Sequence, residues 1–383
     1  MILIKKGILH DGNGRILDGA DILIENTRIK DIGYDLKVSG LTEVVDAKDK
    51  VILPGFIDSL NVWGCMGPGW DDNDLNEHSN PVTPAMDVVY SFDQDSMMFQ
   101  RVFEYGVTSA GITPSTKNVI GGNAAVFKTY GDHPYKMLVK EKAAMISSIT
   151  AETKKLYGPK NLTPMTKMGA FSLLTEALRK ALEYKGKKEK DYNGDYEALL
   201  KVLDKEMPLF INCSTKADMD AIEMALKDFD IDVVFTGAFG IHKDVTKILG
   251  RRAGIVLGDL TCAMSYKNSM VDFSAIKKLV EEDMDIAISS CGDNAASGKE
   301  SLLWNAILYY KNGLDSEDVL KMITSIPSKI LGVDNRIGSV EIGKDADLSI
   351  WSANPIETYA ARAEAVYING ENILNSRRVA SCW

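Results

Sequence analysis

The first 50 residues of this chain alternate short apolar runs with turn residues, a pattern typical of antiparallel strands. The expected strands there are Ile2–Ile4, Ile22–Glu25, Arg28–Ile32 and Val44–Asp46. The same pattern returns at 348–351 and 365–368. We therefore expect residues 1–53 and 338–383 to form one small composite β-sandwich domain, with residues 54–337 inserted between its two parts.

The inserted region shows a second pattern, in which short apolar runs alternate with segments of helical periodicity. The runs are often β-branched, as is typical of strands buried on both faces of a parallel sheet. After a first strand near residue 54, the expected strands are 107–112, 124–129, 137–139, 209–214, 233–237, 255–257 and 286–290. A helix is expected over Thr166–Lys185, with an apolar stripe of Met168, Phe171, Leu174, Leu178 and Leu182. This alternation predicts an α/β protein built from βα units.

Length and charge limit the classes of function. At 383 residues the chain is long enough for one large α/β barrel and a small accessory domain. Its formal net charge of −10 argues against a nucleic-acid partner, and no apolar run reaches the roughly 20 residues of a membrane span. The N-terminus resembles a strand rather than a signal peptide, so we expect a cytoplasmic protein with no membrane contact.

The five cysteines are widely spaced and odd in number, which argues against a disulfide framework. Cys65, Cys213, Cys262 and Cys291 lie near expected strand ends, where a thiolate metal site or a nucleophilic cysteine is chemically feasible. Buried, unreactive thiols are the favoured interpretation. Cys213 should point toward the helices, because its parity is opposite to that of Asn212.

Two long motifs resemble one known family. Pro54-Gly55-Phe56-Ile57-Asp58 resembles the first barrel strand of the amidohydrolase superfamily, and residues 327–332 and 336–348 resemble that family's passage from its last barrel helix into a small β domain. Imidazolonepropionase-related amidohydrolases are the most similar in kind. The resemblance implies a (β/α)8 TIM-like barrel that hydrolyses non-peptide carbon–nitrogen bonds with one or two divalent metal ions.

The resemblance also implies where metal ligands would be expected, and this chain departs from the pattern at each place. The family has histidines on the first, fifth and sixth strands and an aspartate on the eighth, whereas this chain has Leu60, Val62, Asn212, Ser214, Thr236 and Cys291. Leucine and valine offer only hydrocarbon, and neutral amide and hydroxyl oxygens are weak ligands for zinc. We therefore expect these residues to line a pocket without a metal ion, and we expect no cofactor.

Other residues could carry chemistry or bind a ligand. Cys291 and Asp293, two residues apart after the eighth strand, are the catalytic candidates. Asp72 and His78 belong to an acid-rich loop after the first strand, which either binds a cation such as Ca²⁺ or Mg²⁺ or is an ordinary solvated loop.

Residues 118–123 resemble a family segment that borders the site, and Asn118 and Asn123 are candidate ligand-binding residues there. The paired glycines at 121 and 122 permit either close approach of a ligand or a tight turn into the third strand. Lys128 and Lys140 lie near strand ends, where they are carboxylated, bind an anion or are surface lysines. The surface interpretation is the favoured one.

Three functions are open at this stage. The leading hypothesis is an amidohydrolase-family protein that has lost its metal centre and is inactive as a metallohydrolase, so that it is a pseudoenzyme or a small-molecule-binding barrel. The first alternative is an active hydrolase of a cyclic amide or related substrate that uses one metal or non-standard residues. The second is a regulatory or structural subunit. A small-molecule ligand and a homo-oligomer are the expected partners.

Overall fold

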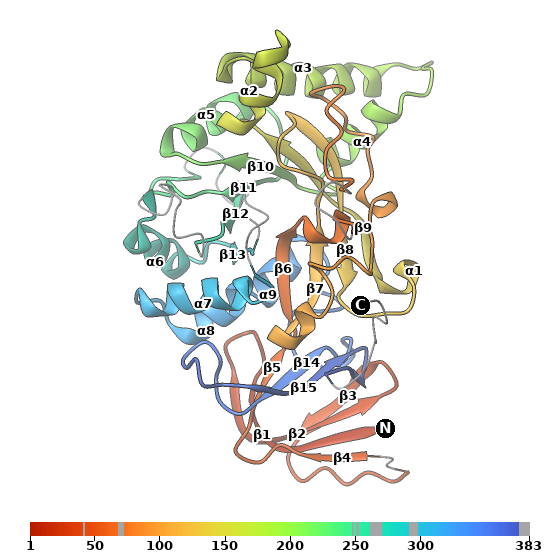
Figure 1. Cartoon of the computed structure of the whole chain (residues 1–383), viewed down its shortest axis with the longest axis vertical. Coiled ribbons are helices and arrows are strands. Elements are labelled where there is room, and N and C mark those ends of the chain that lie inside the picture. Colours follow the sequence, from red (N-terminus) through yellow and green to blue (C-terminus); the bar gives the residue numbers. More distant parts are fainter. Residues whose placement is uncertain are drawn as a thin grey trace.

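The structure is a computed structural model that describes residues 1–40, 43–67, 73–246, 249, 253–260, 270–290 and 298–374. Within these residues two eight-stranded sheets organise the chain, one built from its two ends and one from its centre (Figure 1). Among the helices described, none is both long and apolar enough to cross a membrane.

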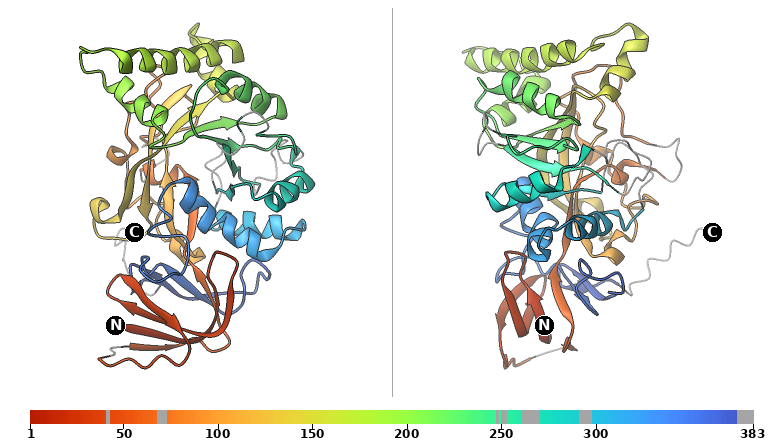
Figure 2. Two further views of the ribbon diagram at one scale, coloured as in Figure 1. Left: turned by 180° about the vertical axis from the view of Figure 1, so that it is seen from behind. Right: turned by 90° about the vertical axis from the view of Figure 1, so that its left-hand side faces the viewer.

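Both ends of the chain contribute to the first sheet, as the sequence pattern predicts. Its strands are β1 (Ile2–His10), β2 (Ile16–Glu25), β3 (Arg28–Gly33), β4 (Glu43–Asp46), β5 (Val51–Pro54), β14 (Leu348–Trp351), β15 (Ala363–Ile368) and β16 (Glu371–Asn372). A two-residue turn at Asn369 and Gly370 joins β15 to β16. Both residues have positive φ, 50° and 76°, which matches a type I′ hairpin turn. Figure 2 shows the N-terminal and C-terminal strands together at one end of the molecule.

Hydrogen bonds join these eight strands in a single sheet. The order is β16-β15-β14-β5-β1-β2-β3, and β4 also pairs with β1. A buried apolar cluster stabilises this sheet and includes Ile4, Ile22, Leu348 and Tyr367. The separate β-sandwich that we expected is therefore not confirmed, although the joint contribution of both ends is.

The second sheet forms a nearly closed barrel. Its strands, which neighbour one another in sequence order, are β6 (Phe56–Asn61), β7 (Val107–Ile112), β8 (Ile120–Lys128), β9 (Leu138–Ser148), β10 (Leu209–Cys213), β11 (Val233–Gly237), β12 (Ala253–Leu257) and β13 (Ile286–Ile288). At the seam between the first and last strands, the Ser59 hydroxyl donates a hydrogen bond of 3.1 Å to the carbonyl oxygen of Ile288. This contact links β6 to β13, although the two strands, as the structure describes them, do not pair along their backbones.

One barrel strand runs against our expectation. β8 pairs antiparallel with both β7 and β9, whereas the other neighbouring pairs are parallel. The connection from β7 to β8 spans only residues 113–119, and a parallel crossover needs about a dozen residues or more. The expectation of eight parallel βα units is therefore wrong at this strand, although the order of the strands agrees with it.

The longer helices follow the later strands. They are α2 (Ala151–Tyr157), α3 (Lys167–Gly186), α4 (Gly194–Leu203), α5 (Lys216–Leu226), α6 (Phe273–Glu281), α7 (Ser301–Lys311), α8 (Ser316–Met322) and α9 (Ser325–Ile330). The earlier connections hold only the short helix α1 (Pro134–Met137) and the 3-10 turns η1 (Trp63–Cys65), η2 (Val88–Tyr90) and η3 (Val102–Tyr105), and a further turn, η4 (Gly158–Lys160), follows α2. In Figure 1, α5 to α8 cover one side of the barrel sheet, while loops border β7 and β8.

The predicted helix at 166–185 is confirmed as α3. Thr166 caps it, because its hydroxyl oxygen accepts a hydrogen bond of 3.2 Å from the backbone N–H of Gly169. Met168 and Leu182 of the expected stripe are 79% and 45% exposed, however. The buried face consists of Ala170, Leu174, Ala177, Leu178, Ala181 and Tyr184. Alanines alternate on this face with larger leucine and tyrosine side chains.

A buried charge network joins the barrel to the terminal sheet. The ammonium group of Lys128, at the end of β8, forms ion pairs with Asp345 and Asp347, and all three side chains are at least 97% buried. Arg336 forms a further ion pair of 2.8 Å with Asp345. The expectation that Lys128 is a surface lysine is therefore wrong. Two buried carboxylates, rather than solvent, compensate the positive charge of Lys128.

Candidate functional site

The carboxyl ends of the parallel strands meet at one end of the barrel, where barrel proteins place their chemistry. Because β8 runs in the opposite direction, it contributes its start, Ile120, to this end. The described side chains that gather here are mostly buried and uncharged: Asn61, Thr113, Ser148, Asn212, Thr236 and Ser290. This end of the barrel is thus polar at its rim and apolar immediately below.

Hydrocarbon fills the place where the family's first-strand histidines are expected. Leu60 is 4% exposed and belongs to the apolar cluster inside the barrel, together with Phe210, Val234 and Val256. Val62 is partly buried and packs against the same cluster. The two residues therefore stabilise the barrel interior, and neither offers an atom that can bind a metal ion.

The fifth and sixth strands bring two of the predicted pocket residues side by side. Asn212 on β10 pairs in register with Thr236 on β11, and both are buried. The Asn212 amide donates a hydrogen bond of 3.1 Å to the hydroxyl oxygen of Thr116. The neutral side chains of Asn212 and Thr236 can form hydrogen bonds with a ligand or with nearby protein groups, but they supply no negative charge.

Ser214 belongs to the cap of α5 rather than to the barrel interior. Its backbone N–H donates a hydrogen bond of 3.1 Å to the Asp218 carboxylate, which also accepts one from Thr215. Burial opposes ionisation of Asp218, but hydrogen bonds from Lys167 and from the two backbone groups outweigh it and lower the pKa of this carboxyl. Asp218 therefore remains charged and fixes the turn that follows β10.

The described residues at the expected ligand positions do not fit a zinc ion. Zinc in proteins takes thiolate, imidazole and carboxylate ligands, whereas these positions hold two hydrocarbon side chains, an amide and two hydroxyls. In the part of the chain that the structure describes, no group of three His, Cys, Asp or Glu side chains could hold a metal ion. Cys291, Asp293 and Asp72 lie outside the described residues.

A buried carboxyl that we did not predict as a site residue closes the barrel at this end. Asp58 on β6 accepts hydrogen bonds from the backbone N–H of Ser290 at 3.0 Å, from the Ser290 hydroxyl, and from the Asn61 amide at 2.8 Å. Burial raises the pKa of Asp58 despite these hydrogen bonds. The sequence feature that could have indicated Asp58 as a site residue is its acidic side chain within the apolar run of the Pro-Gly-Phe-Ile-Asp motif. Its partner at 290 could not be read from sequence.

The two described cysteines are unreactive core residues, as predicted. Cys65 and Cys213 are buried in the cluster between barrel and helices, and the position of Cys213 confirms the parity argument. Burial raises the pKa of the Cys213 thiol well above its usual range, and burial together with Asp74 raises that of Cys65 to about 12. Neither thiol is suited to act as a nucleophile.

Asn118 and Asn123 hold the loop that covers one side of the barrel end. The Asn118 amide donates a hydrogen bond of 2.8 Å to the Glu77 carbonyl oxygen, and the Asn123 amide donates one of 2.9 Å to that of Met86. The paired glycines lie inside β8 rather than in a turn, and a Cβ atom on Gly122 would meet the Met86 carbonyl oxygen at 2.6 Å. The close approach that the glycines permit is made by this loop.

His78 and Lys140 lie in different parts of the fold. His78 sits in the loop, where its ring Nε2 lies 3.1 Å from the Asn76 amide oxygen. Burial lowers its pKa, and Lys117 and Lys160 lower it further. Lys140 lies near the start of β9, at the opposite end of the barrel, and donates a hydrogen bond of 3.0 Å to the Leu331 carbonyl oxygen. Lys140 is therefore not part of the strand-end site.

A cavity of about 370 Å³ lies between this loop and the start of β8. The described residues that line it are Asn73, Asp74, Leu75, Asn76, Glu77, Ala85, Met86, Asp87, Val88, Tyr90, Ser91, Pro114 and Gly121. It is placed beside the barrel end rather than on the barrel axis. The structure therefore offers a concave surface next to the strand ends, although Leu60 fills the interior below them.

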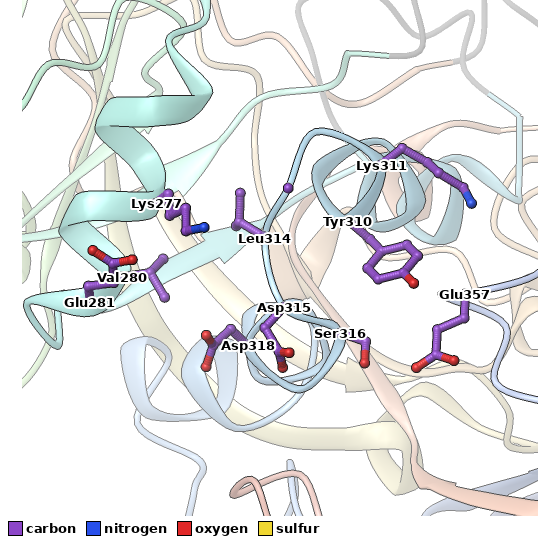
Figure 3. Close-up of a pocket in the computed structure, with 11 residues that line it drawn as sticks. Lys277, Val280, Glu281, Tyr310, Lys311, Leu314, Asp315, Ser316, Asp318 and Glu357 are labelled. Carbon is purple, nitrogen blue, oxygen red and sulfur yellow. The ribbon is translucent and has the colours of Figure 1, made fainter.

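A larger cavity, of about 720 Å³, lies away from the strand ends, between α6, the α7–α8 connection and Glu357. Figure 3 shows its mixed lining, with Lys277 and Glu281 on one side and Tyr310, Lys311 and Glu357 on the other. Its position near the amino ends of the barrel strands separates it from the expected site of chemistry.

Fold and site together define a barrel protein with a terminal sheet and a largely uncharged strand-end site, and comparison with known proteins refines this class. The solved structure of an amidohydrolase from Thermotoga maritima MSB8 is similar over 97% of this chain and 99% of its own, with 27% sequence identity and a TM-score of 0.89. The model of the Amidohydrolase family matches residues 175–373, just over half of the chain, so the chain belongs to this family.

Two relatives are similar over most of the chain. Amidohydrolase tasK of Hapsidospora irregularis is 24% identical over 91% of this chain, which spans only 39% of that relative's length. The 5'-deoxyadenosine deaminase of Methanobrevibacter smithii is 24% identical over 97% of this chain and 90% of its own length. The relatives thus include deaminase-type enzymes.

Proposed function

We propose that this chain is an amidohydrolase-family barrel whose metal centre has been replaced, so that it binds a small molecule without acting as a metallohydrolase. One observation carries the proposal: Leu60, at the position of a first-strand histidine, is buried in the apolar cluster of the barrel. A metal ion at this position would lack the histidine ligand. It would also be surrounded by hydrocarbon side chains, an environment that strongly disfavours a charged group.

The neutral groups on the neighbouring strands support the same proposal. Asn212 and Thr236 replace charged or imidazole ligands, and Asp58 is engaged by Ser290 and Asn61 at the barrel seam. Deaminase-type relatives indicate that the fold descends from enzymes acting on carbon–nitrogen bonds. The ligand of this chain would then be a nitrogen-containing small molecule that is bound rather than hydrolysed.

Hydrolysis assays test the inactivity directly. The purified chain is incubated with 5'-deoxyadenosine and with a cyclic amide, with and without added Zn²⁺ or Mn²⁺, and ammonia release and ring opening are followed. We expect no turnover above the rate of buffer alone. Turnover that needs the added metal and disappears with a chelator would overturn the proposal. Turnover that persists with the chelator would instead favour the metal-independent alternative based on Cys291 and Asp293.

Further parts of the proposal rest on the sequence. We propose the imidazolonepropionase-related subtype, the division into 1–53 plus 338–383 and 54–337, a cytoplasmic location and a homo-oligomeric state. Limited proteolysis checks the boundaries, and light scattering after size-exclusion chromatography checks the oligomeric state. Co-purification with an active homologue would favour a regulatory subunit.

A further inference from the structure

We propose that the cavity of about 370 Å³ beside β8 binds a small organic cation, a protonated or quaternary amine. The inference rests on the proposed small-molecule function and names the ligand class and its place. The volume lies at the lower end of the range of small-molecule sites, roughly 300–1,000 Å³. Its walls come from residues 73–77, 85–88, 90 and 91 of the loop and from Pro114 and Gly121 beside the strand ends.

The charge of the lining selects a cation. Three acidic residues line the cavity, Asp74, Glu77 and Asp87, and the described part of its lining contains no lysine, arginine or histidine. Within the described residues none of the three forms an ion pair. Hydrogen bonds from Ser79 lower the pKa of Glu77, so it stays ionised. His78, which interacts electrostatically with Glu77, is not among the described lining residues. Negative charge collected in a concave surface attracts cationic ligands.

The apolar part of the lining selects an organic cation rather than a bare ion. Leu75, Val88 and Pro114 supply hydrocarbon surface, and the side chains of Met86 and Tyr90 are 46% and 91% exposed. An exposed tyrosine ring at a cavity that carries carboxylates is suited to a cation–π contact with a substituted ammonium group. The thioether of Met86 adds a polarisable surface for the carbon atoms of the ligand.

A metal ion is the weaker occupant of this cavity. Ca²⁺ takes six to eight oxygen ligands at about 2.3–2.6 Å. Among the residues that the structure describes, no three acidic, histidine or cysteine side chains are placed to hold a metal together. The lining combines acidic residues with hydrocarbon, which suits a ligand with one positive group and an apolar body.

The cavity walls are fixed before any ligand binds. The Asn123 amide donates hydrogen bonds to the carbonyl oxygens of Pro84 and Met86, at 3.0 and 2.9 Å. The Ala85 backbone N–H donates one of 3.1 Å to Asp195 at the start of α4. A preorganised site loses less conformational entropy on binding. The loop conformation that shapes the cavity therefore contributes to affinity.

Titration calorimetry at low ionic strength with two matched probes tests the inference. Choline carries the charge, and 3,3-dimethylbutan-1-ol has nearly the same shape without it. We expect saturable binding of choline, weakened by 0.5 M salt, and no measurable binding of the neutral probe. Glu77→Gln and Tyr90→Ala should each weaken choline binding about threefold. The triple variant Asp74→Asn, Glu77→Gln, Asp87→Asn should weaken it about 30-fold.

Two matched controls separate this cavity from general surface charge. Glu357→Gln removes a carboxylate from the other cavity, and Tyr359→Ala removes a tyrosine that is 68% exposed. Both variants should bind choline like the parent chain. Equal binding of the two probes, or loss of choline binding in a control instead of in Glu77→Gln, overturns the inference. Absence of choline binding also overturns it, while a metal-free, inactive protein would leave the proposed function intact.

Discussion

Replacing Lys128 by methionine tests how the barrel is held to the terminal sheet. The Lys128 side chain is 1% exposed, and those of Asp345 and Asp347 are 3% exposed, so the substitution leaves carboxylates buried without this cation. Arg336, at 2.8 Å from Asp345, compensates only one of them directly. Breaking a buried ion pair by removing one partner costs about 3–5 kcal/mol. We expect a loss of this size in the free energy of unfolding.

Urea denaturation followed by circular dichroism and by tryptophan fluorescence measures the effect. Lys136→Met is the matched control, because Lys136 pairs with Asp132 at 3.0 Å while both side chains are about 70% exposed. That surface pair contributes less than about 1 kcal/mol. The reasoning is refuted if Lys128→Met is no more destabilising than the control, since the buried carboxylates would then be compensated without Lys128.

Three further predictions concern the barrel. Leu60→Ala should destabilise the chain by about 2–5 kcal/mol through the cavity it leaves, whereas Leu182→Ala, at a 45% exposed position, should cost less than about 1 kcal/mol. The pKa of Asp58 is raised in the folded state, so its contribution to stability falls as the pH rises through that pKa. In urea titrations the parent should therefore gain stability relative to Asp58→Asn as the pH is lowered from 7 to 4. A difference in the free energy of unfolding that stays constant over this range would contradict the prediction. Native Cys65 and Cys213 should resist Ellman's reagent at pH 8, since they are buried and the pKa of Cys65 is about 12; the Cys65→Ala, Cys213→Ala variant should label to the same extent as the parent.

Local patterns predicted most of the elements. Strands 107–112 and 233–237 agree with β7 and β11 in both bounds, and α3 begins one residue after the expected start, because Thr166 is its cap. Runs of β-branched residues and capping residues are local signals. They are read from a few neighbouring positions and need no knowledge of tertiary contacts.

The sequence does contain information on the direction of β8, which our prediction did not use. A connection of seven residues, 113–119, is too short for a parallel crossover. The apolar face of α3 was missed for a different reason. Alanines carry a weak hydrophobic signal, so the larger Met168 and Leu182 dominated the predicted stripe, although both are exposed.

The site depended on contacts that sequence patterns do not contain. Asp58 meets Ser290 across 232 positions, and Lys128 meets Asp347 across 219. Local periodicity contains no information on contacts between residues so far apart in sequence. For this reason the sequence pattern does not indicate Asp58 as a site residue and favours a surface position for Lys128. The motif at residues 54–58 identified the strand, and the fold then showed that Leu60 lies in the barrel interior. The same motif thus indicated the family and located the position at which Leu60 stands in place of an expected histidine.

Metal content tests the replaced metal centre most directly. The chain is expressed with ample zinc and manganese, purified without chelators, dialysed, and measured by inductively coupled plasma mass spectrometry against protein concentration. We predict far less than one metal ion per chain, both in the parent and in Leu60→Ala. One equivalent of zinc or manganese that survives dialysis in the parent would contradict the proposed loss of the metal centre.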